Sequence, residues 1–509
     1  MSEPSGVEVQ LLSILFFYAL IFLVGIAAYR RRERGLSSGD LLVAGRSMPV
    51  FLCIATMTAT WVGGGYINGT AEAIYDSNLG IVWTQAPWGY AISMVIGGLF
   101  FAGKMRRMNY TTLLDPFEQR YGKHVAAWLF IPALVGEVFW SAAILVALGT
   151  TFGTILGFDV SISILVSASV AIGYTVVGGL WSVAYTDVLQ LSCLMLGLFL
   201  AIPFALQEAG GADFVFRNAY AQMPSFPTGT SRWVWFDMAL LLCLGGVPWQ
   251  VYFQRVLAAK DDRIAVRFSI IAAIGCLLAA APAVVIGCVG LSADWSQTAA
   301  GQPPESALVL PYVLKYLTPS WVATIGLGAV AAAVMSSVDS SILSASSLFV
   351  WNVYRPHFRP NAGEREIAIT LRIAVIAVGI AATALALSVQ SVYALWYLCA
   401  DLVYVILFPQ LVAALYVRSA NSIGAVAAMF TGLLLRVGGG EATFGIPVLL
   451  PYPWIVDEGQ TTEFPFRTFA MLSALITLIV VSKLTKNWSS PKPLEAVESS
   501  ENKSESIGH

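Results

Sequence analysis

The chain has 509 residues, of which 57% are hydrophobic and only 11% are charged. Soluble globular proteins carry about 25% charged residues, so the composition excludes an ordinary soluble protein and indicates one embedded in membrane lipid. A net charge of −2 gives no reason to expect nucleic acid as a partner. The sequence also lacks a nucleophile paired with a base, a zinc-ligand motif and a phosphate-binding loop, so we do not expect an enzyme.

Apolar runs of about 20 residues, enough to cross about 30 Å of hydrocarbon, recur from end to end. We count 13 runs, the first over 9–29 and the last over 465–485, and predict an all-α membrane protein with 13 transmembrane helices. The acidic segment MSEPSGVEVQ precedes the first run, and the basic segment RRRERG follows it. Further clusters of Lys and Arg follow alternate runs, and the cluster after the seventh run starts at Arg255. Because cytoplasmic loops are enriched in Lys and Arg, the pattern predicts an N-terminus outside the cell and a C-terminus inside.

Two runs contain glycine clusters that weaken a helix. The run at 50–68 includes MTATWVGGGYINGT around Gly63, and the run at 236–257 includes CLGGVPWQVYFQ around Pro248. Proline removes a backbone donor and glycine weakens a helix, so both runs are predicted to unwind at membrane depth. Paired breaks indicate a transporter binding site, and runs two to six and seven to eleven then form a five-plus-five inverted-repeat core. The alternative is that these glycines only serve helix packing.

Aromatic residues accompany both breaks. Trp61 and Trp249 stand at the breaks, Trp140 lies in the fourth run and Tyr90 in the third. Tryptophan normally belongs to the interfacial belt, so three at mid-depth indicate a cavity whose walls hold a quaternary ammonium by cation–π attraction. The alternative is that the four rings only pack helices together.

The run at 318–350 offers hydroxyl groups for a sodium site. Ser336 and Ser337 stand three and four residues after Ala333, and Ala59 and Val62 have an i, i+3 relation at the first break. An unwound helix frees backbone carbonyls for a cation, so these five positions predict a five-oxygen sodium site. The alternative is that the serines bond to their own helix backbone.

Carboxylates inside membrane spans are costly and indicate function. Asp339 lies in the same run, and Asp187, near the start of the sixth, is placed to pair with it around a second cation. Glu137 shares a helix face with Trp140 at i, i+3. It either adds negative potential near a bound cation or bonds to a neighbouring helix.

Seven stretches of the sequence together resemble the sodium:solute symporter family. They are MTATWVGGGYINGTAEA (57–73), TLLDPFEQRYGK (112–123), VGGLWSVAYTDVLQL (177–191), LGGVPWQVYFQRVL (244–257), AAVMSSVDSSILSASS (332–347), LWYLCADLVYVILFPQL (395–411) and the GGE at 439–441. The resemblance runs from about residue 10 to 485, and several stretches resemble the choline branch of the family.

The resemblance implies inward choline transport driven by sodium, with a chloride requirement, on the five-plus-five core. It implies a choline cage on Trp61, Tyr90, Trp140 and Trp249, and a sodium site on Ala59, Val62, Ala333, Ser336 and Ser337. It places a further sodium near Asp339 and Ser340, opposite Asp187. It also implies block by hemicholinium-type bis-quaternary compounds. The implied location is the plasma membrane, with presynaptic terminals and vesicle membranes of cholinergic neurons, where choline supplies acetylcholine synthesis.

Domain boundaries follow from the same pattern. We expect an N-terminal helix and cytoplasmic basic loop over 1–49, repeats over 50–207 and 236–418, an extracellular loop over 208–235, two peripheral helices over 419–486 and a disordered cytoplasmic tail over 487–509. Two competing interpretations remain. One keeps the fold but changes the cargo to another small organic solute such as proline, a sugar or an anion. The other is an ion channel.

Overall fold

The structure is a computed structural model that describes residues 43–177 and 180–497. Most of these residues are helical, because a segment in lipid must satisfy its own backbone hydrogen bonds. The α-helices are α3 (Val50–Trp61), α4 (Gly64–Tyr75), α5 (Gly80–Trp83), α6 (Ala86–Ile96), α7 (Gly103–Arg107), α8 (Asp115–Tyr121), α9 (Lys123–Leu156), α10 (Val160–Val177), α11 (Leu180–Glu208), α12 (Ala212–Gln222), α13 (Ser231–Gly245), α14 (Gln250–Ala258), α15 (Asp262–Ser292), α16 (Val309–Tyr316), α17 (Ser320–Leu348), α18 (Glu364–Ser388), α19 (Val392–Leu402), α20 (Phe408–Tyr416), α21 (Ser422–Gly438) and α22 (Phe466–Leu484).

Shorter elements join these helices. The π-helical segments are η2 (Gly97–Ala102), η5 (Phe349–Phe358) and η6 (Val403–Leu407). The 3₁₀ turns are η1 (Ala44–Arg46), η3 (Trp295–Gln297), η4 (Ser306–Leu308), η7 (Ala442–Phe444) and η8 (Asp457–Gly459). A two-residue antiparallel pair, β1 (Ile455–Val456) and β2 (Thr461–Thr462), lies in the loop before α22.

Both predicted helix breaks are present. Helix α3 ends at Trp61 and α4 begins at Gly64, with a bend of 47° between them. Helix α13 ends at Gly245 and α14 begins at Gln250, and the backbone of Trp249 between them is extended. The glycine and proline positions therefore mark real interruptions of two helices rather than packing contacts alone.

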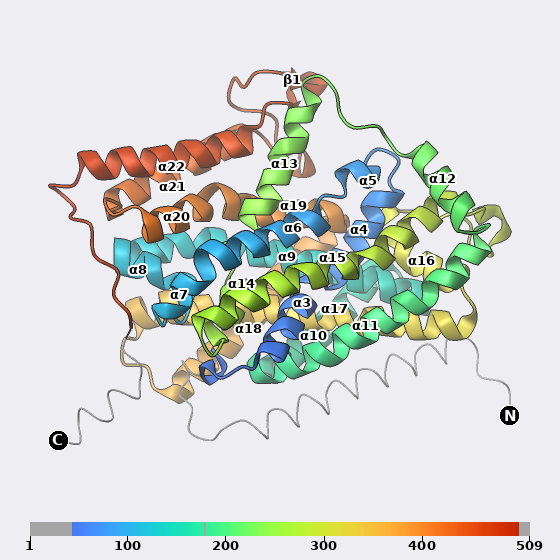
Figure 1. The fold of residues 1–509 in the computed structure, drawn as a ribbon, viewed down its shortest axis with the longest axis horizontal. Helices are drawn as coiled ribbons and strands as arrows, with labels where there is room; N and C mark the ends of the chain where they lie inside the picture. The colour runs from blue at the N-terminus through green and yellow to red at the C-terminus, as the bar shows by residue number, and fades with distance from the viewer. Residues whose placement is uncertain (1–42, 178–179, 498–509) are drawn as a thin grey trace.

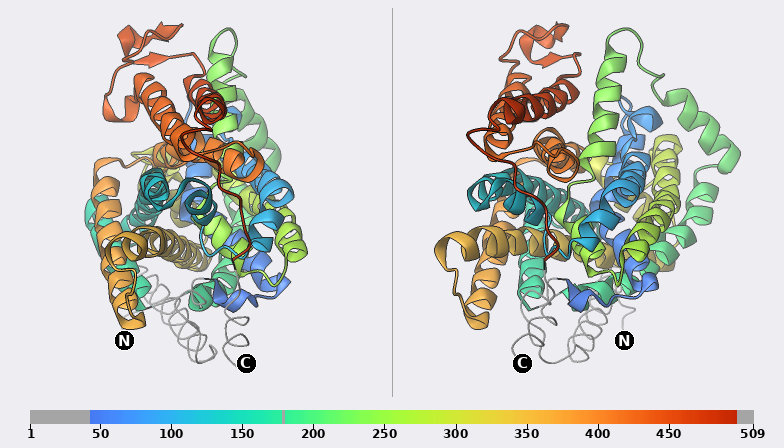
Figure 2. Two further views of the ribbon diagram at one scale, coloured as in Figure 1. Left: turned by 90° about the vertical axis from the view of Figure 1, so that its left-hand side faces the viewer. Right: turned by 60° about the vertical axis from the view of Figure 1, so that its left-hand side comes forward.

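The broken helices lie among packed neighbours at the centre of the molecule. Helices α11, α17, α9 and α19 pack in succession, and both α3 and α4 contact α17. Helix α15 packs across α3, α4 and α6, and Figure 1 shows it crossing the molecule in front of α9 and α17. Helices α21 and α22 pack on each other and lie along one edge in every view (Figure 2).

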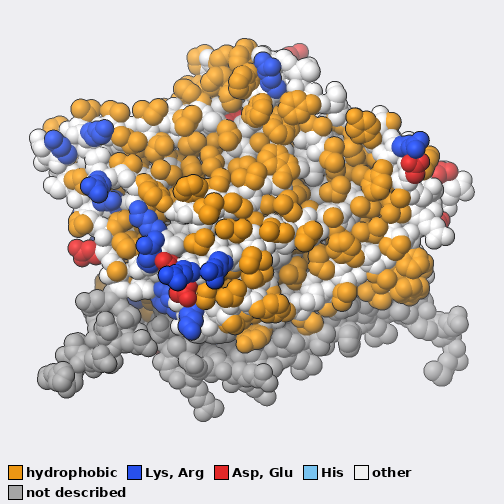
Figure 3. Space-filling view, in the orientation of Figure 1, with side chains coloured by type: hydrophobic (Ala, Val, Ile, Leu, Met, Phe, Trp, Pro, Cys, Tyr) orange, Lys and Arg blue, Asp and Glu red, His pale blue; other side chains and the backbone are white. Residues whose placement is uncertain are grey.

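The surface is that of a membrane protein. Figure 3 shows apolar side chains across the middle of the face, with most Lys and Arg gathered toward its left-hand end. In the described part of the chain, eight helices are long and apolar enough to cross a membrane, or nine if the bent pair α3–α4 is one span. Three shorter apolar helices, Val160–Gly173, Ser320–Ala331 and Ser422–Gly438, fall within further expected spans. The expected helix at 9–29 lies outside the described residues.

Two expected segments differ from the prediction. The loop predicted over 208–235 contains helix α12. The tail predicted to be disordered is bonded to the protein as far as Val497: Arg120 Nη1 donates to the Lys492 carbonyl at 2.5 Å, and Val497 N–H donates to the Met108 carbonyl at 2.9 Å. Buried donors on α8 explain this, since the tail supplies acceptors for them. Residues 498–509 lie outside the described part.

Candidate functional site

The four predicted cage residues form one buried aromatic cluster. The ring centroid of Trp61 lies 4.8 Å from that of Tyr90, 6.2 Å from Trp140 and 6.3 Å from Trp249. Trp140 and Trp249 are 5.5 Å apart with ring planes at 82°. None of the four side chains is more than 5% exposed. Residues from α3, α6, α9 and the α13–α14 break thus meet at one place.

The second break reaches this cluster because it carries a glycine. A Cβ on Gly246 would lie 2.5 Å from Ser93 Oγ and 2.8 Å from Tyr90 Cδ1, distances that real Cβ contacts do not allow. Only a residue without a side chain lets the α13–α14 backbone approach α6 this closely. The approach carries Trp249 alongside Trp61, and Trp249 Nε1 donates to the Gly245 carbonyl at 2.7 Å. The indole of Trp249 is therefore held by its own break.

Trp396 on α19 belongs to the same cluster and was missed from the sequence. Its ring stacks on Tyr90 at 5.4 Å and lies edge-on to Tyr66 at the same centroid distance. No glycine or proline marks its position in LWYLCADL, so no local signal distinguishes it from a lipid-facing tryptophan. Only the packing of α19 against α4 and α9 brings it here.

Polar groups beside the cluster are only partly satisfied. Trp61 Nε1 is buried and has no hydrogen-bond partner in the described structure. Glu137 Oε2 accepts from Ser341 Oγ at 2.9 Å, whereas Glu137 Oε1 is buried and unpartnered. Glu137 therefore bonds to α17, the second of the two roles expected for it, and still leaves one carboxylate oxygen available next to Trp140.

One of the predicted sodium residues, Ser337, lies where α17 passes the first break. Ser337 Oγ donates to the Thr60 carbonyl at 3.4 Å, and a Cβ on Gly63 would lie 1.7 Å from that hydroxyl oxygen. Backbone bonds run from Val62 N–H to Thr58 and from Ile67 N–H to Gly63, and no backbone N–H of the described residues donates to the carbonyls of Ala59 or Val62. These two carbonyls are left to other donors or to a cation.

Ala333 and Ser336 belong to the same helix, α17, but their side chains lie outside the described part of the structure. The described geometry therefore places Ser337 against the first break, at Thr60 and Gly63, and the five-ligand site stays a prediction.

The residues proposed for a second ion are arranged around an arginine. Arg255 Nη2 lies 3.6 Å from Asp187 Oδ2 and donates to Ser340 Oγ at 2.8 Å, and Thr56 also donates to Asp187. Asp339 instead accepts from Thr175 Oγ1 at 2.8 Å, and its Oδ2 is buried without a partner. A guanidinium thus lies within 3.6 Å of the Asp187 carboxylate.

Arg255 corrects one detail of the sequence interpretation. It was counted with the cytoplasmic loop after the seventh run, but its side chain is 0% exposed. The reason is that α14 follows the break and is buried along its whole length. A basic residue immediately after an apolar run looks like a loop residue, and only tertiary contacts with Asp187 and Ser340 reveal otherwise.

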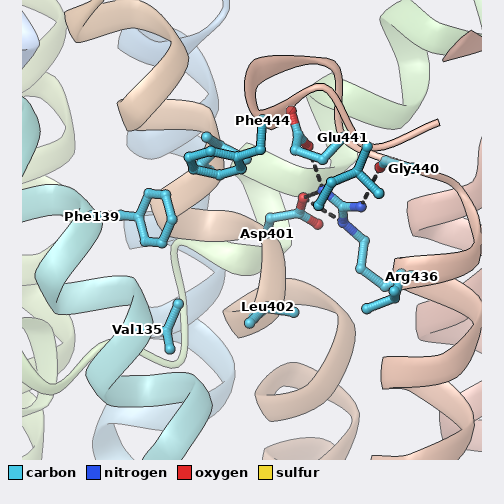
Figure 4. Close-up of a pocket in the computed structure, with 11 residues that line it drawn as sticks. Val135, Phe139, Asp401, Leu402, Arg436, Gly440, Glu441 and Phe444 are labelled. Atoms are coloured by element: carbon cyan, nitrogen blue, oxygen red, sulfur yellow. Dashed lines mark hydrogen bonds and ion pairs between the residues drawn. The ribbon is translucent and has the colours of Figure 1, made fainter. Parts of the chain in front are cut away.

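A cavity of about 160 Å³ lies between α9, α19, α21 and the loop that follows α21 (Figure 4). Phe139 and Phe444 line one side of it in an edge-to-face contact with ring centroids 6.0 Å apart, while Asp401, Arg436 and Glu441 form its charged side. Arg436 Nε donates to Asp401 Oδ2 at 2.5 Å and its Nη2 donates to Glu441 Oε2 at 2.6 Å.

Arg467 on α22 completes this charged group. Its Nε lies 3.2 Å from Asp401 Oδ2 and its Nη2 lies 3.5 Å from Glu441 Oε2. The four residues form a closed set of two guanidinium groups and two carboxylates that ties α19 to the peripheral helices.

Comparison with known proteins places the chain among membrane transporters. A model of the Sodium:solute symporter family matches residues 41–432. The chain is 50% identical over 492 residues to High affinity choline transporter 1 of Homo sapiens, covering 94% of this chain and 85% of that protein. It is 48% identical over 491 residues to High-affinity choline transporter 1 of Caenorhabditis elegans, covering 93% and 84%.

The fold has counterparts among solved structures. The chain superposes on a substrate-bound, outward-open Na⁺-coupled sialic acid symporter with a TM-score of 0.75 and 18% identity, over 95% of this chain and 98% of that one. At this identity the likeness establishes the fold alone: an all-α, multi-span membrane protein with a LeuT-like fold.

Proposed function

The chain belongs to the sodium:solute symporter family, and we propose that it carries choline into the cell together with sodium, at high affinity. It is a transporter and not an enzyme. The observation that carries the proposal is the cluster of Trp61, Tyr90, Trp140 and Trp249 at two helix breaks. The relatives that share about half of its residues are themselves named as choline transporters.

The chemistry of the cluster supports a quaternary ammonium. Such a cation has no N–H to donate, so aromatic faces suit it better than hydrogen-bond acceptors, and each face contributes roughly 0.5–2 kcal/mol. Two pairs of rings meet at steep angles, Trp61 with Trp249 at 6.3 Å and 64° and Trp140 with Trp249 at 5.5 Å and 82°, so the cluster presents ring faces in more than one direction.

Sodium is proposed to bind where α17 meets the first break. Ala59 and Val62 supply backbone carbonyls and Ser337 a hydroxyl, with Ala333 and Ser336 as the remaining ligands. The unshared carbonyls at the break support this assignment. A second sodium near Asp339, Ser340 and Asp187 remains part of the proposal, and Arg255 is the group that such an ion displaces from Asp187. A chloride requirement is likewise proposed, with no residue assigned to it.

The proposed topology has 13 spans, with the N-terminus outside and the C-terminus inside. The bent pair α3–α4 starts the first repeat, 50–207, and the α13–α14 pair starts the second, 236–418. The matching position of the two breaks supports this division. In the proposed transport cycle, sodium orders the first break, choline completes the cage, and the repeats rock to release both inside. The inward sodium gradient and a negative interior favour that direction, at about 2.3 kcal/mol per charge per 100 mV.

Uptake of radiolabelled choline tests the proposal in cells that express the chain, with sodium replaced by N-methylglucamine. Saturable, sodium-dependent uptake that hemicholinium-type compounds block is the expected result. Trp61→Ala and Trp249→Ala should each raise half-saturating choline by up to about 30-fold, the equivalent of about 2 kcal/mol for one ring. Trp233→Ala, which removes a tryptophan 42% exposed, is the matched control. Normal uptake by both cage variants at normal surface expression would refute the cage.

One alternative keeps the family and changes the cargo to another small organic solute. Sodium-dependent currents or uptake without any choline transport would support it. The pairing of tryptophans at both breaks disfavours sugars and carboxylates, because those solutes need hydrogen-bond donors at these positions.

A further inference from the structure

An open pocket of about 520 Å³ lies where α7, the start of α15 and the end of α20 meet. Its charged lining consists of Lys104, Arg107, Arg263 and Arg267, with one carboxylate, Asp262. Four basic groups against one acid leave a formal excess of three positive charges. Figure 3 shows this concentration of Lys and Arg toward the left of the face, directly beside apolar surface.

Two of the four basic residues have their own partners, and two do not. Arg107 Nε lies 3.1 Å from Asp262 Oδ2, and Lys104 donates to the Leu415 carbonyl and sits 4.1 Å over the Tyr416 ring. Arg263 and Arg267 form no ion pair with any described carboxylate. They stand at i, i+4 on α15, where like charges repel each other. An anion in the pocket would relieve this repulsion.

The apolar rim of the pocket continues along an exposed apolar surface. Leu99 and Phe100 of η2 line the pocket and are 57% and 58% exposed. On α15, the face that carries Arg263 and Arg267 continues at helical spacing through exposed Ile271, Ile274 and Leu278. A basic pocket followed by an exposed apolar helix face is complementary to a phosphate headgroup followed by an acyl chain.

We propose that this pocket binds the headgroup of an anionic phospholipid, whose acyl chains lie along η2 and the exposed face of α15. Basic pockets between spanning helices bind anionic headgroups elsewhere, at about 1 kcal/mol per Lys or Arg near the membrane surface. A bound lipid neutralises Arg263 and Arg267 and fixes α15 against α7. Because α15 packs across α3, α4 and α6, the site adjoins the helices that carry the aromatic cluster without sharing a residue with them. The inference does not depend on which solute is carried.

The test measures lipid retained by the purified full chain in nanodiscs of phosphatidylcholine, with and without phosphatidylinositol phosphate, by native mass spectrometry. The double variant Arg263→Gln/Arg267→Gln should bind phosphatidylinositol phosphate about 30-fold more weakly, as the loss of two such charges implies. Arg263→Lys/Arg267→Lys keeps the charges and should retain binding. Arg217→Gln, at an exposed arginine paired with Asp213, is the control for charge alone.

Two results would overturn the proposal. The first is equal retention of phosphatidylinositol phosphate by the Gln double variant and the unmodified chain. The second is displacement of the lipid by inorganic phosphate at millimolar concentration, which would make the pocket a site for a small soluble anion. Melting temperatures of the variants in phosphatidylcholine alone, which should not change, separate loss of the site from loss of the fold.

Discussion

The contact between Gly63 and Ser337 can be tested by replacing the glycine with alanine. The added Cβ would lie 1.7 Å from Ser337 Oγ and 2.5 Å from Ser337 Cβ. A rotamer change moves the hydroxyl but not the Cβ, so α17 and the break must separate by about an ångström. Overpacking of this kind costs typically 1–3 kcal/mol, and we expect about 3 kcal/mol here because the clash involves the immobile Cβ.

A second substitution should restore the fit. Ser337→Gly removes both clashing atoms, and the nearest remaining atom, the Ser337 Cα, lies 3.9 Å from the new Cβ, which is an ordinary contact. Glycine within a helix costs up to about 1 kcal/mol, so the double variant should recover about 2 kcal/mol of the loss. The two substitutions are therefore expected to be strongly non-additive.

Thermal melting of the purified single and double variants measures this coupling, and sodium activation of choline uptake measures function. Gly63→Ala should melt well below the parent chain, and Gly63→Ala/Ser337→Gly should recover most of the loss. Because the double variant still lacks the Ser337 hydroxyl, its half-saturating sodium should remain raised. Equal melting of Gly63→Ala and the parent, or no recovery in the double variant, would contradict the close packing of α17 on the break.

Two further predictions concern the charged group beside the cavity of Figure 4 and the hydrogen-bonded residues 487–497. Asp401→Asn leaves Arg436 and Arg467 sharing only the Glu441 carboxylate, so the chain should lose about 3–5 kcal/mol of stability and its melting temperature should fall. The control Asp213→Asn, at an exposed surface pair, should change the melting temperature little. Equal effects of the two substitutions would refute a structural role for the buried group. Truncation before residue 487 removes the hydrogen bonds of the tail and should cost about 1–3 kcal/mol by melting, whereas truncation before residue 498 should cost nothing measurable.

The helix breaks were predictable from the sequence because their cause is local. Glycine and proline act on their own backbone, so Gly63 and Pro248 indicate an interruption whatever surrounds them. The convergence of the aromatic residues was predictable for a related reason, since indoles at mid-depth are rare unless they face a protein interior. The prediction of the aromatic cluster thus followed from the position of its tryptophans near the middle of their spans.

The rest of the site depends on contacts between distant segments. Trp396 reaches Tyr90 only because α19 packs beside α4 and α9, and no residue near Trp396 signals this. Arg255 is buried because α14 continues inward after the break, although its sequence position is typical of a cytoplasmic loop. The order of residues 487–497 likewise depends on donors of α8, more than 350 positions earlier in the chain.

The proposed sodium ligands and the cage share one short segment, and this has a thermodynamic consequence. Ala59 and Val62 flank Trp61, so an ion that fixes their carbonyls also fixes the ring that forms one wall of the cage. Ordering the backbone of one residue costs about 1–2 kcal/mol of conformational entropy. If sodium has already ordered Val62 and Gly63, the binding free energy of choline is not reduced by that entropic cost. The saving is comparable to typical coupling between sites, 1–3 kcal/mol or about 5–150-fold in affinity. Because linkage is reciprocal, bound choline must then strengthen sodium binding by the same factor. In the proposed arrangement the two cargoes are therefore coupled through the short segment 59–63 rather than through the whole fold.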